Sequence, residues 1–90
     1  MLFVVVERFK GGDAKAVYRR FRDRGRGMPD GVTVHGSWTA ASLERCFMVI
    51  ECDHAGLIQE WVAHWADLVD FEIVPVATGQ DTAELLGPLL

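Results

Sequence analysis

The 90-residue sequence contains no long hydrophobic run. No stretch approaches the roughly 20 apolar residues that a membrane-spanning helix needs. The apolar stretch after Met1 is too short for a secretory signal peptide, and no basic segment precedes it. These absences exclude a membrane partner and lead us to expect a cytoplasmic protein.

Cysteine is scarce, and the two cysteines are Cys46 and Cys52. Six residues apart on one strand, they would be separated by roughly 20 Å, whereas a disulfide needs Cα atoms within about 7 Å. The sequence therefore predicts two free thiols, which suits a reducing compartment. Cys52 and His54 are too few ligands for a structural zinc site, so we expect no metal and no cofactor.

Basic residues are nearly absent beyond position 26, since eight of the nine Lys and Arg residues lie within the first 26 positions. Five of these are arginines between Arg19 and Arg26. One interpretation is an anion or phosphate patch. The other is a solvated helix face that complements acids such as Asp67 and Asp70. Nucleic-acid modules are usually basic overall and this chain carries a net charge of −4, so we favour the second interpretation and expect no nucleic-acid partner.

Half of the residues are hydrophobic, which is enough for a packed core. Alternating β-branched and aromatic residues predict four strands, and helically spaced apolar residues after Asp13 and Asp53, two candidate N-caps, predict two helices. The expected strands are 2–9, 32–39, 44–52 and 69–78. The first expected helix runs from Ala14 through Phe21 and is stopped by Gly25 and Gly27; the others are 55–66 and a short one in the tail, 80–86.

This order, β-α-β-β-α-β, predicts an α+β domain of the ferredoxin-like type with a four-stranded antiparallel sheet. Right-handed crossovers and a central hairpin give the strand order 4-1-3-2. Pro75 cannot donate a ladder hydrogen bond, so the fourth strand should lie at an edge. We expect residues 1–90 to form a single domain with a core of residues 1–78 and a C-terminal tail of residues 79–90.

Both faces of the predicted sheet are apolar. Two helices cover only one face, and the other should be polar if it meets water. In the first strand, however, Phe3 and Val5 point to one side while Val4 and Val6 point to the other. A second copy related by a two-fold axis is the simplest cover, so we expect a homodimer paired through its sheets.

Four segments carry a resemblance to a known family: 5–9, Ser37-Trp38, 45–47 and 61–76, the last with its Trp-x-x-x-Trp and Pro-Val pattern. They resemble a small bacterial family known only as a domain of unknown function, similar in fold to the dimeric α+β barrel superfamily. The resemblance covers residues 1 to about 78 and leaves the tail outside.

The resemblance implies a two-fold dimer whose sheets close into a barrel. Better-known members of the superfamily include cofactor-independent monooxygenases, haem-degrading enzymes, isomerases and stress-responsive proteins. No catalytic residue set is established for the small family, so the resemblance assigns no residue role here.

One polar constellation follows from the expected strand register. A two-residue loop at Ala41-Ser42 would pair Trp38 with Arg45, and the neighbouring first strand would bring Glu7 close to Arg45. An arginine holds a carboxylate through two parallel hydrogen bonds. The group is either a polar anchor at the mouth of an apolar pocket or a structural ion pair at a sheet end.

Three further residues are candidates for a site. His35, expected on the same side as Thr33 and Ser37, either faces a cavity as a general base or lies exposed on an outer strand. Trp61 and Trp65 lie one helical turn apart, and either roof a pocket together with Trp38 or form part of the core.

The sequence is therefore compatible with two functions. The first is a domain that binds a small, mostly apolar molecule, or a cofactor-independent enzyme, with Glu7, Arg45 and His35 as catalytic candidates and Trp38, Trp61 and Trp65 as pocket candidates. The alternative is a structural or regulatory interaction module without catalysis. The sequence does not decide whether the domain is an enzyme.

Overall fold

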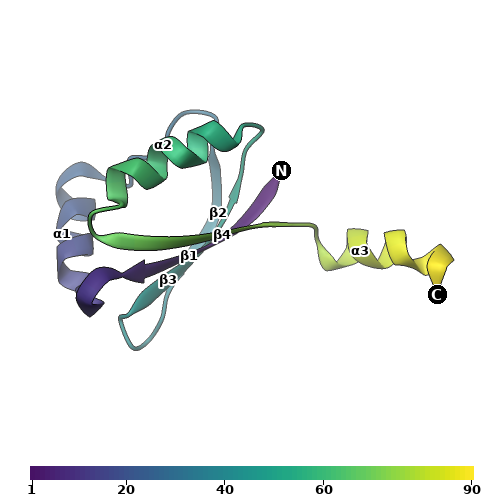
Figure 1. Ribbon diagram of the computed structural model, residues 1–90, viewed down its shortest axis with the longest axis horizontal. Helices are drawn as coiled ribbons and strands as arrows, with labels where there is room; N and C mark the ends of the chain where they lie inside the picture. The colour runs from purple at the N-terminus through teal and green to yellow at the C-terminus, as the bar shows by residue number, and fades with distance from the viewer.

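The computed structural model describes residues 1–90 and shows an α+β domain with one four-stranded antiparallel sheet and three helices (Figure 1). All the expected elements are present, and their ends differ from expectation by two residues or fewer. The elements are β1 (Leu2–Phe9), α1 (Ala14–Arg24), β2 (Thr33–Thr39), β3 (Arg45–Glu51), α2 (Ala55–Trp65), β4 (Val69–Val76) and α3 (Gly79–Leu86), with short 3-10 turns at Lys10–Gly12 and Gly87–Leu89.

The strand order is β2-β3-β1-β4, as expected, and it fits a ferredoxin-like fold. β4 pairs only with β1, so it is an edge strand, and its Pro75 lies opposite Phe3. The expectation that proline marks an edge is confirmed, because an edge strand leaves one row of backbone groups free of the ladder.

The two predicted helix caps have different outcomes. Asp13 caps α1, since its carboxylate accepts a hydrogen bond from the backbone N–H of Ala16 at 3.1 Å. The prediction for Asp53 is wrong: His54 precedes α2 and no side chain caps that helix. The Asp53 carboxylate lies instead 3.9 Å from the N-terminal amine of Met1.

The core lies between one face of the sheet and the helices α1 and α2 (Figure 1). Trp61 on α2 is its largest fully buried side chain, 1 % exposed, and packs edge-to-face on Phe71 with ring centroids 5.0 Å apart. The indole N–H groups of Trp61 and Trp65 donate to the carbonyl of Arg26 at 3.2 and 2.9 Å. Two buried donors are thereby satisfied, and the loop after α1 is fastened to α2.

The arginine-rich helix is tied to its acidic surroundings. The guanidinium of Arg20 donates two hydrogen bonds to the carboxylate of Asp67, at 2.8 and 2.5 Å, and lies 5.3 Å from the centre of the Trp65 ring. This pair agrees with the interpretation of the basic run as a helix face complemented by acids.

We expect Arg20→Gln to return the pKa of Asp67 from about 2 towards 3.8, because the guanidinium stabilises the charged carboxylate. A depressed pKa means that the pair stabilises the fold above pH 3.8 and that this contribution is lost as the pH falls through about 2. Carboxyl NMR titration measures the pKa. Arg19→Gln, which removes the same charge from the same helix, is the control and should leave Asp67 unchanged; equal effects of the two variants would contradict the assignment.

No helix in the structure is both long enough and apolar enough to span a membrane.

Candidate functional site

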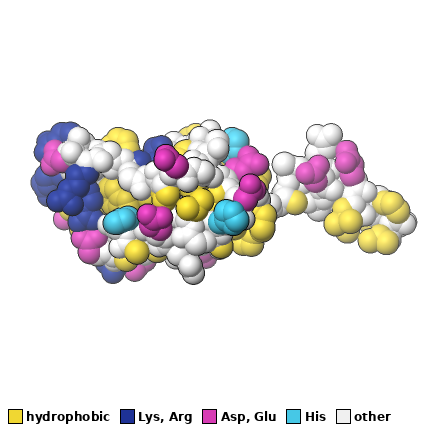
Figure 2. Space-filling view, turned by 90° about the horizontal axis from the view of Figure 1, so that it is seen from above, with side chains coloured by type: hydrophobic (Ala, Val, Ile, Leu, Met, Phe, Trp, Pro, Cys, Tyr) yellow, Lys and Arg dark blue, Asp and Glu magenta, His cyan; other side chains and the backbone are white.

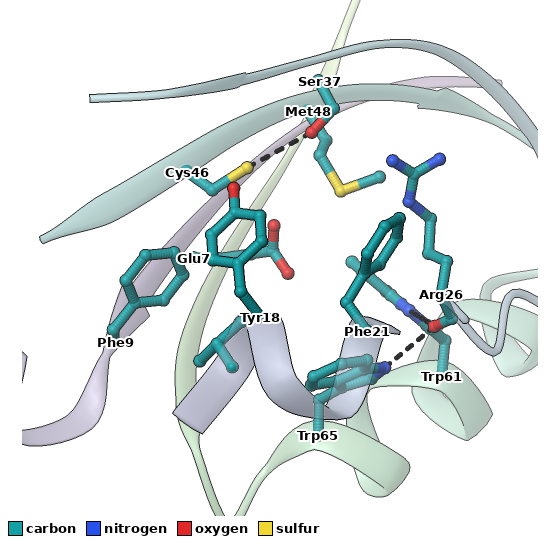
Figure 3. Close-up of a pocket in the computed structure, with 11 residues that line it drawn as sticks. Glu7, Phe9, Tyr18, Phe21, Arg26, Ser37, Cys46, Met48, Trp61 and Trp65 are labelled. Atoms are coloured by element: carbon teal, nitrogen blue, oxygen red, sulfur yellow. Dashed lines mark hydrogen bonds between the residues drawn. The ribbon is translucent and has the colours of Figure 1, made fainter. Parts of the chain in front are cut away.

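A pocket opens between α1 and the helix-covered face of the sheet (Figure 3). Its cavity volume is about 80 Å³, below the roughly 300–1,000 Å³ of typical ligand sites, so the pocket suits only a small molecule. Most of its wall is apolar or aromatic. The residues lining it are Glu7, Phe9, Val17, Tyr18, Phe21, Arg26, Ser37, Cys46, Met48, Trp61 and Trp65.

Glu7 is the one charged residue buried in the structure, at 8 % exposure. The odd-numbered residues of β1 face the helices. Because side chains alternate along a strand, Glu7 points to the same side as Val5 and Phe9. Its carboxyl group points into the pocket (Figure 3). Loss of water around the carboxylate raises the pKa of Glu7, and contact with Cys46 and the charge of Arg26 offset only part of that rise.

Cys46 lies opposite Glu7 on β3 and shares the pocket wall. Its sulfur lies 3.3 Å from the hydroxyl of Ser37, as the dashed line in Figure 3 marks. Burial raises the pKa of the Cys46 thiol, and the nearby Glu7 carboxylate raises it further. Since the thiolate is the reactive form, this thiol is a neutral donor rather than a nucleophile.

Arg26 brings a positive charge to the pocket from the loop that follows α1. Its backbone carbonyl is held by the two indole N–H groups described above, and its guanidinium lies 5.6 Å from the centre of the Phe21 ring. This placement leaves a cationic group beside an aromatic wall, where it can bind an oxygen anion or a carbonyl.

Aromatic residues of α1, together with Phe9 at the end of β1, form the rim. Phe9, Tyr18 and Phe21 pack edge-to-face in sequence, with ring centroids 6.4 and 6.3 Å apart. The hydroxyl of Tyr18 forms a hydrogen bond with that of Thr39, which joins α1 to the end of β2. Tyr18 and Phe21 remain partly exposed, so a ligand reaches the pocket past their rings.

The polar groups around the pocket are mainly donors. Below its raised pKa, Glu7 carries a proton; the Cys46 thiol is neutral, and the guanidinium of Arg26 is always charged. A site of this kind suits a ligand that presents an oxygen acceptor on an apolar body. No three His, Cys, Asp or Glu side chains are grouped so that they could hold a metal ion.

Three of the candidate residues lie together as pocket residues: Glu7, Trp61 and Trp65. Arg45 and Trp38 lie elsewhere. Glu7 is paired with Cys46, and Arg45 with Arg8. The expected meeting of Glu7 with Arg45 is therefore wrong, because a shift of one residue between β1 and β3 turns Arg45 to the opposite face of the sheet.

The hairpin loop is also longer than expected. Trp38 pairs with Phe47 instead of Arg45, and the backbone N–H of Ala40 donates to the carbonyl of Arg45. Leu43 adopts a positive φ of 63° inside the turn. This conformation is uncommon for residues other than glycine, so the sequence does not predict it. Trp38 stays with Arg45 on the open face, where the Arg45 guanidinium lies 5.0 Å from the Phe47 ring centre.

His35 lies at a β-bulge, since the register of β2 against β3 shifts between Val34 and Gly36. Its Nε2 atom is 2.8 Å from a carboxylate oxygen of Glu51. The bulge separates His35 from Ser37, which contacts Cys46 on the pocket side. The expectation that His35 and Ser37 share one side is wrong, and His35 lies at the exposed surface in contact with Glu51.

Sequence reasoning did not assign Arg26, Tyr18, Phe21, Ser37 and Cys46 to the pocket. The helical spacing of Tyr18 and Phe21 was visible, but it predicted core packing. Arg26 was part of the basic run assigned to a solvated face. Its position depends on the two tryptophan hydrogen bonds to its carbonyl, which connect segments far apart in the sequence.

The chain matches the model of one protein family, described as a domain of unknown function (DUF3303), over residues 1–90. The match includes the tail, which the motif resemblance left outside. No curated protein and no solved structure matches the chain.

Proposed function

The chain belongs to the DUF3303 family of unknown function, and we propose from its pocket that it binds a small planar molecule whose oxygen accepts a hydrogen bond from Glu7. One observation carries this proposal: a carboxyl group at 8 % exposure points into an apolar pocket. Buried carboxyl groups are costly when they serve only packing. A perturbed acid in a pocket is a typical functional group.

The walls and the donors together define the ligand class. Trp61, Trp65 and Phe21 offer flat apolar surfaces, which suit an aromatic or conjugated ring. Glu7 and Arg26 offer hydrogen-bond donors to an oxygen on that ring. We therefore propose an aromatic or conjugated carbonyl compound as the chemical class of ligand.

The same arrangement permits cofactor-independent proton transfer. A protonated carboxyl held against a carbonyl oxygen acts as a general acid, and the carboxylate that remains acts as a base. A raised pKa brings the group closer to neutral pH, where such exchange is most efficient. Glu7 takes the catalytic role in this proposal, while Arg45 and His35 lie outside the pocket.

Acetophenone and α-methylstyrene form a matched pair of probes, because they differ mainly in a carbonyl oxygen that replaces a methylene group. We expect acetophenone to bind roughly tenfold more tightly, since one donated hydrogen bond distinguishes them. Titration followed through the indole N–H signals of Trp61 and Trp65 measures both affinities.

Glu7→Leu should remove the preference for acetophenone while α-methylstyrene still binds. Glu60→Leu, at an exposed position on α2, is the control and should keep the preference. Failure of both probes to bind the unchanged protein, or an unchanged preference in Glu7→Leu, would contradict the proposal.

The sheet face opposite the helices supports a second part of the proposal, a homodimer of the dimeric α+β barrel type. This open face is formed by side chains that no helix covers, and Trp38 and Val74 are its most exposed apolar members. Monomeric proteins rarely expose a continuous apolar surface of this kind. Its apolar residues are Leu2, Val4, Val6, Trp38, Phe47, Val49, Val74 and Val76.

Trp38→Ser should weaken self-association by roughly tenfold or more, because large aromatic residues dominate interfaces. Trp38 is 59 % exposed in the single chain, so the fold itself should change little. Sedimentation velocity over a concentration series measures the effect, and His64→Ser on the outer side of α2 is the control. A protein that remains monomeric at high concentration would contradict the pairing.

An interaction module without catalysis is the second candidate, and the open face is the observation that favours it. A dimer that binds neither acetophenone nor α-methylstyrene would identify this function instead.

A further inference from the structure

The chain ends in an arm, residues 77–90, that extends away from the sheet and its two covering helices (Figure 1). Every residue of the arm is exposed. The arm stretches the molecule to 49 Å along its longest axis and brings its radius of gyration to 15.0 Å, compared with about 12 Å for a compact chain of this length.

The arm is an ordered helix rather than a loose tail. The side chain of Thr78 caps α3 by accepting a hydrogen bond from the backbone N–H of Asp81 at 3.1 Å, and the hydroxyl of Thr82 donates to the carbonyl of Thr78 at 2.9 Å. A helix of eight residues is nevertheless marginal in water on its own. It therefore needs a surface to pack against.

Leucines provide the apolar side of the arm, and they gather towards the end of the chain (Figure 2). Leu85 is 72 % exposed, and Leu86, Leu89 and Leu90 are exposed as well. Such a group of large apolar side chains, with no cover from its own domain, is typical of an interaction surface.

We infer that the arm of each copy packs its leucines against the open sheet face of a second copy, as part of the same two-fold interface. The chain carries two apolar surfaces that its own helices leave uncovered, the open sheet face and the leucine side of the arm. In a two-fold dimer each copy supplies both surfaces, so reciprocal docking covers them together.

Charge favours this partner. The arm carries Asp81 and Glu84, and no Lys or Arg follows Arg45 in the chain. The open face carries Arg8 and Arg45, which lie opposite each other across β1 and β3. Arg8 already has an acidic neighbour, since its guanidinium lies 3.9 Å from the carboxylate of Glu72 on β4, whereas Arg45 forms no ion pair within the chain. Like charges in adjacent positions of a sheet repel each other, and an acidic side chain from the arm of a second copy would give Arg45 a partner.

The position and length of the arm are consistent with an arm that each copy contributes to the other copy. It leaves the sheet at Val76, which pairs with Leu2 at the end of the edge strand β4, and then runs outward from its own domain (Figure 1). Its eight-residue helix is about 12 Å long, enough to lie along about half of a strand of eight residues.

A photo-crosslinking amino acid, p-benzoyl-phenylalanine, in place of Leu89 tests the docking directly. The protein is prepared in two isotopic forms that are mixed in equal amounts before irradiation. We expect crosslinked peptides of mixed isotopic composition that join the arm to β1, β3 or β4. Crosslinks found only within one isotopic form, with none of mixed composition, would show that the arm folds back on its own domain. Any of three results would overturn the inference: such a fold-back, crosslinks to the outer sides of α1 and α2, or no crosslink at all.

Self-association of arm variants provides the second test. The double variant Leu85→Glu, Leu89→Glu should raise the dimer dissociation constant roughly 100-fold, because two buried leucines are lost from the interface. Gln80→Glu adds charge to the same helix at its polar beginning and is the control. Binding of acetophenone should be unchanged in all three proteins, since the pocket lies on the other side of the sheet. An unchanged dissociation constant in the double variant would overturn the inference and leave the proposed pocket untouched.

Discussion

Replacing Trp61 by alanine is expected to lower the free energy of unfolding by about 3–5 kcal/mol, the usual cost of removing a large aromatic side chain from a core. Trp61 is 1 % exposed, packs on Phe71, and donates a hydrogen bond to the carbonyl of Arg26. The substitution opens a cavity and leaves that carbonyl with only Trp65 as its donor. Small domains are stable by only about 5–15 kcal/mol, so this variant should be close to unfolding. Equilibrium denaturation in urea measures the loss.

Trp38→Ala is the matched control, because it makes the same chemical change at a position that is 59 % exposed. It should cost less than about 1 kcal/mol when measured at concentrations where the protein is monomeric, as is usual for surface substitutions. Trp61→Phe should retain most of the stability, since it keeps an aromatic ring beside Phe71. Equal losses for Trp61→Ala and Trp38→Ala would contradict the assignment of the core.

In the unchanged protein the free energy of unfolding is expected to fall as the pH rises, and Glu7→Gln is expected to abolish this fall. The pKa of Glu7 is raised in the folded state above its ordinary value of 4.5. Between these two values the folded state binds more protons than the unfolded state, so the free energy of unfolding falls with rising pH. The stabilisation is fully present below pH 4.5 and is lost as the pH passes through the folded pKa. Each unit by which the pKa is raised corresponds to about 1.4 kcal/mol.

Urea denaturation at a series of pH values measures this dependence. At neutral pH the Glu7→Gln variant should be more stable than the unchanged protein, because an amide requires no desolvation of a charge. Glu60→Gln at the exposed surface of α2 is the control and should keep the pH dependence. A Glu7→Gln variant that is less stable at every pH would show that the carboxylate forms a stabilising contact and that the burial argument is wrong.

The strands and helices follow from local patterns, and these patterns were readable in the sequence. Val4, Val5 and Val6 indicate a strand through their β-branched side chains, and the spacing of Trp61 and Trp65 indicates a helix. The edge position of β4 also follows from a local cause, the missing N–H of Pro75. Each of these features depends on one residue type and its immediate neighbours.

Strand register depends on details that no local pattern announces. The positive φ of Leu43 and the bulge at His35 each change which side chains face the helices. As a result, the candidate residue Glu7 was given the wrong arginine as its neighbour. The charge that faces it comes from Arg26, whose position depends on the long-range contacts of Trp61 and Trp65.

The pKa of Glu7, measured by carboxyl-carbon NMR with and without saturating acetophenone, tests the central claim most directly. A carbonyl oxygen accepts a hydrogen bond only from the protonated carboxyl, so binding must raise the pKa if the two groups meet. We predict a pKa above 4.5 in the free protein and a further rise when acetophenone is bound. An ordinary pKa that acetophenone leaves unchanged would contradict the account, because Glu7 would then be a solvated residue outside any binding site.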